Sequence, residues 1–174
     1  MTHMKIQAVI AKIMAYPNPM GFPGPAKPEV LMVGIPTLEK GVFRDFTPML
    51  RKRFEICGRW QYATHGTWLS IGDMEGLLSD TNDSLINSLK TQIEALKDGW
   101  PDHACSLFRP ERLSVFSCSD LGNDSIFLLW LDLEDEPELW VYDSNGESRY
   151  KNLDEYLSAY LADDLSASTK SWRA

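Results

Sequence analysis

Apolar residues recur every three or four positions in four stretches of this chain, which is the spacing of helices with one buried face. The first predicted helix covers residues 3–15, and its apolar face comprises Ile6, Val9, Ile10 and Ile13. A second has Pro48 in its first turn and ends before Gly58. A third is capped by Asp83 or Ser84 and buries Leu85, Leu89, Ile93 and Leu96. The last predicted helix lies near the C-terminus, and its inner face comprises Leu153, Tyr156, Leu157, Tyr160 and Leu161.

Shorter apolar runs between these helices predict strands. They cover residues 29–36 (a buried strand or packed extended segment), 60–72 (a hairpin), 112–116, 125–133, 138–142 and 147–150. In residues 125–133 only Asp132 interrupts the apolar run after the first residue, which predicts a central strand buried on both faces. His65-Gly66 supplies the turn of the first hairpin, and Asn145-Gly146 favours a tight turn before the last strand.

The order of these elements indicates an α+β fold, because helices precede a run of strands and do not alternate with them. We expect a single domain over residues 1–174, with a mixed or antiparallel sheet and a C-terminal strand meander flanked by helices. Residues 16–28 hold five prolines and two glycines, so we expect them to be an irregular tether. Residues 1–28 are therefore interpreted as an N-terminal helix with a proline-rich tether.

Charge narrows the class of partner. The chain has a formal net charge of −8, which disfavours direct contact with nucleic acid because phosphate contacts need a basic surface. From Cys118 to Asp164 there are 13 acidic residues against Arg149 and Lys151, a net charge of −11. Such an acidic face serves solubility and is also suited to docking on a basic protein.

Cysteine spacing and hydropathy restrict the cellular context. Cys57, Cys105 and Cys118 are odd in number and form no CxxC pair, which argues against a disulfide framework and a zinc ribbon. No apolar run is long enough for a membrane helix, and Lys12 interrupts the apolar part of the N-terminus. We therefore expect a cytoplasmic protein without contact to a membrane, and we predict neither a bound metal nor a cofactor.

Catalytic chemistry is the alternative to binding. A small hydrolase or transferase could use Cys118 or Asp120 with His103, but no known nucleophile signature surrounds these residues. Asp120 and Asp124 could pair for acid–base work, although Asp is also an ordinary turn former. The basic run 51–53 is interpreted as a solvated helix face, and the acidic run 132–138 as a solvated hairpin turn without the ligand spacing of a calcium loop.

The C-terminal half resembles the SUKH superfamily over about residues 112–162. The resemblance lies in a strand, a small-residue turn, an apolar strand ending in Leu-Asp, an acidic hairpin, a Val-Tyr-Asp strand and a final helix. Its carriers are Phe116, Gly122, Asn123, Leu131, Asp132, Val141, Tyr142, Asp143, Leu153, Tyr156 and Leu157. In the N-terminal half, residues 34–46 are a loose counterpart of the family's entry motif, and the NGG-like turn of the family is missing.

This resemblance implies a SUKH-like α+β fold without catalytic residues. Bacterial members of the family are commonly immunity proteins that neutralise a cognate polymorphic toxin, often a nuclease, and fungal members are scaffolds that regulate cell-wall synthesis. The hypothesis is therefore a non-enzymatic immunity protein that binds a basic toxin domain, with a regulatory scaffold as the alternative. We expect the partner to contact the acidic C-terminal face and any outward-facing aromatic side chains, with candidates Glu134, Asp135, Glu136, Asp143, Trp130 and Trp140.

Overall fold

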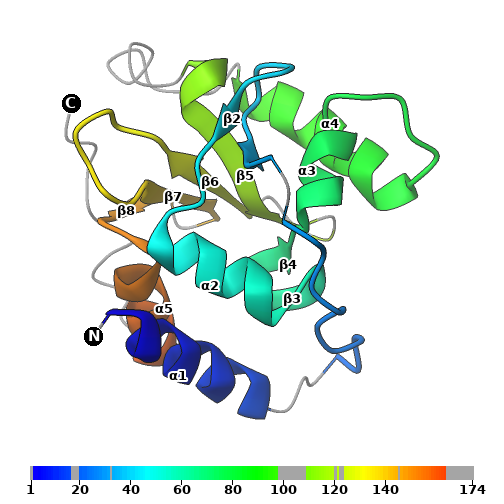
Figure 1. The fold of residues 1–174 in the computed structure, drawn as a ribbon. Coiled ribbons are helices and arrows are strands. Elements are labelled where there is room, and N and C mark those ends of the chain that lie inside the picture. Colours follow the sequence, from blue (N-terminus) through cyan, green and yellow to red (C-terminus); the bar gives the residue numbers. More distant parts are fainter. Residues whose placement is uncertain are drawn as a thin grey trace.

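The structure is a computed structural model that describes residues 2–16, 20–31, 33–97, 109–119, 121, 124–144 and 146–163. The helices are α1 (Thr2–Ala15), α2 (Pro48–Ile56), α3 (Ile71–Gly76), α4 (Ser84–Lys97) and α5 (Leu153–Leu161), with a 3-10 turn at Pro110–Arg112. The strands are β1 (Ile35–Pro36), β2 (Phe43–Arg44), β3 (Trp60–Thr64), β4 (Gly66–Trp68), β5 (Leu113–Cys118), β6 (Ser125–Leu129), β7 (Glu138–Asp143) and β8 (Gly146–Tyr150). Figure 1 labels these elements along the ribbon, apart from β1 and the 3-10 turn.

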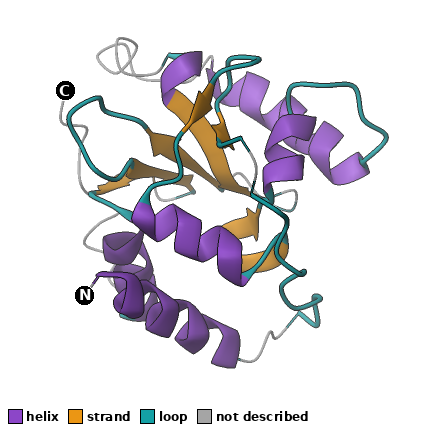
Figure 2. Ribbon diagram, viewed as in Figure 1, coloured by secondary structure: helices purple, strands orange, loops and turns teal. Residues whose placement is uncertain are grey.

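A six-stranded antiparallel sheet forms the centre of the fold, in the order β3-β4-β5-β6-β7-β8. Within this sheet the strands are neighbours in the order of the sequence, so the last four form the expected C-terminal meander. The separate pair β1-β2 is also antiparallel. The prediction of an α+β fold with an antiparallel sheet and flanking helices is confirmed (Figure 2).

The core lies around β5 and β6, which are buried at every position. Strand β6 is the predicted central strand, but it ends at Leu129 because the chain then turns to the surface, where Asp132 and Leu133 are exposed. Aromatic side chains join neighbouring strands across this core: Phe127 stacks on Trp140 with 5.2 Å between ring centroids.

Helices cover the sheet in two groups (Figure 1). Helix α1 packs on α2 and α5, and α5 also contacts β7 and β8. Helix α4 lies beside α3 (Figure 1). It also contacts β5, because the amide oxygen of its Gln92 lies 3.5 Å from the thiol sulfur of Cys118. None of the described helices is long and apolar enough to cross a membrane.

The N-terminal proline-rich segment lies against the sheet, and its residues 20–28 form no regular structure. The Phe22 ring lies 4.4 Å from the ring of Tyr62 in β3, measured between centroids. The backbone N–H of Ala26 donates to the carbonyl of Arg59, and its own carbonyl accepts from the N–H of Gly58.

A buried strand or packed extended segment was predicted for residues 29–36, and a buried strand is found only at the end of this range. Only Ile35–Pro36 is a strand, whereas Val30 and Val33 are 86% and 70% exposed. Residues 34–36 at the end of the segment are buried, whereas its first part runs over the surface, where the Glu29 carboxylate accepts from the N–H of Gly72 in α3. Apolar composition therefore did not imply burial here, because these side chains have no facing element.

Helix α3 replaces the end of the predicted hairpin 60–72. Ser70 is its N-cap: the Ser70 hydroxyl accepts from the N–H of Asp73, and the Asp73 carboxylate accepts from the N–H of Ser70. This reciprocal pair is a capping box built on Asp. It stops strand β4 at Trp68, so Ile71 belongs to a helix and not to the second arm of the hairpin.

The basic run 51–53 is not one solvated face, which corrects the interpretation from sequence. Arg51 is exposed and Lys52 is half-buried, but Arg53 has no exposed surface. Successive residues of a helix point about 100° apart, so three neighbours cannot share one environment. The Arg53 guanidinium donates to three backbone carbonyls, at Cys57 (3.2 Å), Gly58 (3.3 Å) and Leu69 (2.8 Å).

Candidate functional site

The loop between β6 and β7 combines acidic residues with an exposed apolar side chain. Asp132, Glu134 and Asp135 are exposed, and Leu133 between them is 98% exposed. Leu133 is thus the most exposed of the large apolar side chains in the described residues. Because its side chain is not buried in its own chain, Leu133 could fill an apolar pocket on another molecule.

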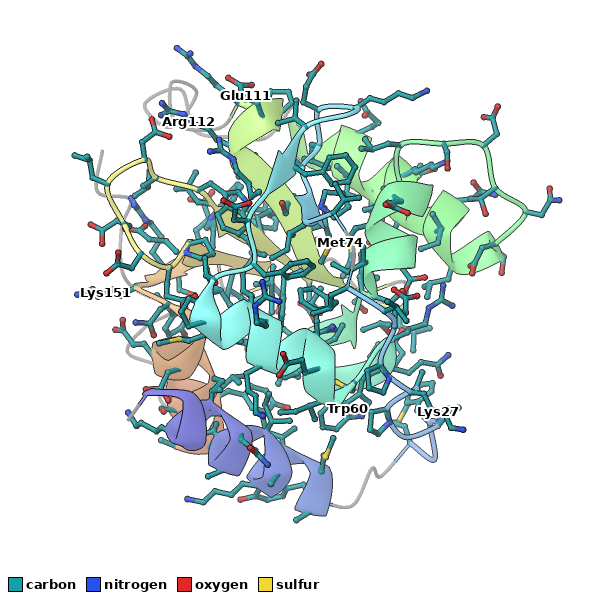
Figure 3. All side chains as sticks on the ribbon, in the orientation of Figure 1. Lys27, Trp60, Met74, Glu111, Arg112 and Lys151 are labelled. Atoms are coloured by element: carbon teal, nitrogen blue, oxygen red, sulfur yellow. The ribbon has the colours of Figure 1, made fainter. Side chains whose placement is uncertain are left out.

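Two arginines hold the start of this loop, one in the 3-10 turn before β5 and one in β2. The Asp132 carboxylate accepts from the Arg112 guanidinium at 3.2 Å, and Arg44 of β2 lies 3.9 Å from the other carboxylate oxygen. Figure 3 labels Arg112 at the end of the molecule where this loop leaves the sheet. Because Asp132 is mostly exposed, each ion pair alone contributes little, but together they restrict where the loop points.

The end of the loop is attached to helix α2. The Glu136 carboxylate accepts from the Met49 N–H at 2.9 Å and from the Thr47 hydroxyl. It therefore provides an acceptor for a backbone N–H in the first turn of α2. A carboxylate in this position also interacts favourably with the positive end of the helix dipole. Glu136 therefore holds the loop in place, and Leu133, Glu134 and Asp135 form its free tip. We call these three residues the loop tip.

Two of the predicted partner-binding residues lie in the interior. Trp140 has no exposed surface and Trp130 is 7% exposed, with its indole N–H donating to the Ser114 hydroxyl at 3.0 Å. Trp140 lies on β7, an inner strand of the sheet that is covered on both sides, and Trp130 directly follows the buried strand β6. The condition that these tryptophans point outward is therefore not met, and they cannot anchor a partner on the folded surface.

Asp143 lies at the opposite end of β7 from the loop, beside a histidine. The carboxylate of Asp143 is 3.8 Å from Nε2 of His65, and the other imidazole nitrogen of His65 lies 2.8 Å from the Tyr156 hydroxyl. Burial raises the pKa of nearby Asp124, an effect that His65 opposes and Asp143 reinforces. Asp143 is thus part of a cluster at the turn between β3 and β4 and not of the acidic loop.

The structure describes only part of the alternative catalytic set. Asp120 and His103 lie outside the described residues. The Cys118 side chain is buried, 3.3 Å from the Ser125 hydroxyl and 3.5 Å from the Gln92 amide oxygen. A thiol in this position has no exposed surface through which to meet a substrate. Among the described residues, no group of three or more His, Cys, Asp or Glu side chains could hold a metal ion.

Sequence reasoning found the acidic residues of the loop but missed Leu133, which was taken as the end of a strand. The signal that could have identified it is local: an isolated leucine between acidic residues, directly after an apolar run. The roles of Arg112 and Arg44 could not be found in the same way, because they lie 20 and 88 residues away from Asp132 in the chain.

Comparisons with known proteins leave the chain without a relative that could assign its family. No family model, curated protein or solved structure matches it.

Proposed function

We propose that this protein is a non-enzymatic binding module that docks on a basic protein through the loop tip. The observation that carries the proposal is a loop attached at both ends, which presents Leu133 to solvent between Asp132 and Glu134. Most specifically, we propose a cytoplasmic immunity protein that covers the active site of a cognate toxin. The resemblance of residues 112–162 to the SUKH superfamily supports this class of partner.

Within the loop tip, Leu133 would contribute mainly to the affinity, and the two acidic residues mainly to the association rate. Full burial of the Leu133 side chain in a partner's pocket would contribute about 2 kcal/mol. Because Asp132 and Glu136 already hold the ends of the loop, little conformational entropy is lost on binding. The charges of Glu134 and Asp135 remain near solvent and would chiefly accelerate association with a basic surface.

The experiment begins with affinity capture from the native cells and identification of the retained protein by mass spectrometry. We expect one tight, basic partner, whereas a regulatory scaffold would retain several weak ones. Binding is then measured with Leu133→Asp, with the double reversal Glu134→Lys and Asp135→Lys, and with the control Asp80→Lys. Asp80 is also an exposed acidic residue but lies in the segment between α3 and α4.

Leu133→Asp should weaken binding by at least about tenfold, as expected for loss of a buried leucine anchor. The double reversal should lower the association rate and its dependence on salt, and Asp80→Lys should leave both unchanged. Unchanged affinity of Leu133→Asp would refute docking through the loop tip. Failure of the captured partner to lose its toxic activity in the complex would refute the immunity function while leaving the docking surface standing.

A further inference from the structure

Two arginine side chains from separate elements converge on one carboxylate at the start of the acidic loop. Arg112 is the last residue of the 3-10 turn, Arg44 is the last residue of β2, and both approach Asp132. The side chains of Arg44 and Arg112 are 28% and 29% exposed, and that of Asp132 is 64% exposed. The place between the two arginines that Asp132 occupies can therefore be reached from solvent.

Hydrogen bonds to the backbone fix the two arginines relative to each other. The N–H of Leu38, which follows β1, donates to the carbonyls of Pro110 (3.1 Å) and Leu113 (2.8 Å). These bonds join the β1-β2 pair to the 3-10 turn. The Arg44 guanidinium is also held, because its Nε and Nη2 donate to the Glu111 carbonyl at 3.2 Å and 2.8 Å (Figure 3 labels Glu111). The pair of guanidinium groups is therefore arranged before any ligand arrives, which lowers the cost of binding one.

The Asp132 carboxylate fills the place between the arginines incompletely. Its Oδ2 accepts from Arg112 Nη2 at 3.2 Å, but its Oδ1 lies 3.9 Å from Arg44 Nη1, which is too far for a hydrogen bond. A carboxylate has two oxygens and a single charge, whereas a phosphate monoester has three acceptor oxygens and a charge of about −1.5 to −2 at pH 7. Arginine forks bind phosphate through parallel hydrogen bonds. A phosphate group is therefore a better bridge between the two guanidinium groups than the aspartate is.

We propose that Arg44 and Arg112 form a binding site for a phosphate group, and that Asp132 is the internal ligand which the phosphate displaces. Displacement costs little, because exposed ion pairs such as those of Asp132 are weak. It frees the start of the loop, while Glu136 continues to hold the end of the loop on α2. The site goes beyond the proposed docking function, and its test needs no protein partner.

The charges around the site set the strength of binding. The acidic residues of the loop tip follow Asp132 directly in the chain, so their negative charges oppose an incoming anion. We therefore expect phosphate to bind with millimolar affinity, and more weakly as the salt concentration rises. The same phosphate chemistry is present in inorganic phosphate and in phosphate esters, and the test compares these two sources.

The test is an NMR titration of the protein with inorganic phosphate, with sodium chloride at equal ionic strength as the control. We expect phosphate, but not chloride, to shift the Nε–H resonances of Arg44 and Arg112 along one saturable curve. The heteronuclear NOE of the Leu133 amide should fall along the same curve, because the start of the loop is released. Glycerol phosphate is titrated in parallel. Equal affinity assigns recognition to the phosphate group alone, and tighter binding adds contacts to the rest of the ester; both results support the site.

Substitutions separate the internal ligand from the general effect of charge. Asp132→Asn removes the competing charge and should tighten phosphate binding by at least about threefold. Asp135→Asn makes the same change of charge at an exposed position of the same loop and should have a smaller effect. Arg112→Gln should weaken binding by at least about tenfold, whereas Arg51→Gln, at an exposed position of α2, should leave it unchanged. Circular dichroism checks that each variant is folded.

Three results would overturn the proposal. The first is a phosphate titration without saturable shifts of the two arginine resonances. The second is equal phosphate affinity of Asp132→Asn and Asp135→Asn, which would show that Asp132 does not compete for the site. The third is wild-type affinity in a folded Arg112→Gln variant, which would show that phosphate binds elsewhere.

Discussion

Replacement of Arg53 by methionine tests whether the buried guanidinium stabilises this fold. Methionine keeps most of the apolar volume of the arginine stem but removes every donor. The carbonyls of Cys57, Gly58 and Leu69 then lose their bonds to the guanidinium in a buried environment. The guanidinium also lies 4.2 Å from the centre of the Phe54 ring, a contact that methionine replaces only by dispersion.

The magnitude follows from two opposing contributions. Each buried carbonyl left without a donor costs about 1–3 kcal/mol. Against this, burial lowers the pKa of Arg53 to about 10, so the charge itself opposes folding at neutral pH and its removal is favourable. Since the carbonyls belong to the backbone and stay behind, the losses outweigh the gain. We expect Arg53→Met to lower the free energy of unfolding by about 2–4 kcal/mol.

The assay is urea unfolding at pH 7, followed by tryptophan fluorescence and analysed by linear extrapolation. Arg51→Met is the matched control, because Arg51 lies on the same helix and is exposed, and it should change stability by less than about 1 kcal/mol. Arg53→Lys should also be destabilising, since one ammonium cannot reproduce the planar fork that spans Cys57 and Leu69. Stability of Arg53→Met equal to the wild type would refute the reasoning.

Two further substitutions test local geometry by the same unfolding assay. Gly66→Ala should destabilise the protein by more than about 3 kcal/mol, because a Cβ there would lie 2.5 Å from the carbonyl carbon of Cys118. Gly41→Ala is its control, with a similar positive φ but open space around it, and should cost only about 1 kcal/mol; equal effects would contradict the clash. Glu136→Ala should cost about 1–2 kcal/mol through loss of the α2 N-terminal contacts, and Glu134→Ala should cost nothing measurable. Similar stability of these two variants would show that Glu136 is not a structural residue.

The helices other than α3 and the C-terminal strands could be predicted because their patterns are local. The isoleucine and valine spacing in residues 3–15 gave α1 to within one residue, and Asp83 accepts from the N–H of Ile86 as a cap should. The meander of β5 to β8 followed from short apolar runs separated by turns. Each of these signals lies within about ten residues of chain, so no tertiary contact was needed to find it.

Features that depend on distant partners could not be predicted. The burial of Arg53 requires the carbonyl of Leu69 and the rings around it, which only the folded chain supplies. The exposure of Val30 and Val33 depends on the absence of a facing element in the described residues, which composition does not reveal. Among the candidate site residues, some chosen for their charge are exposed, such as Glu134. Trp140, which was chosen because it is aromatic, lies in the core.

The contacts of the proline-rich segment bear on where the smallest folding unit of this chain begins. Its Ala26 backbone is paired with Gly58 and Arg59, its Phe22 ring covers Tyr62, and α1 ahead of it packs on α2 and α5. A fragment starting after residue 28 would expose those backbone groups and the apolar faces of two helices at once. The stretch that looks most like a dispensable leader is therefore an integral part of the domain.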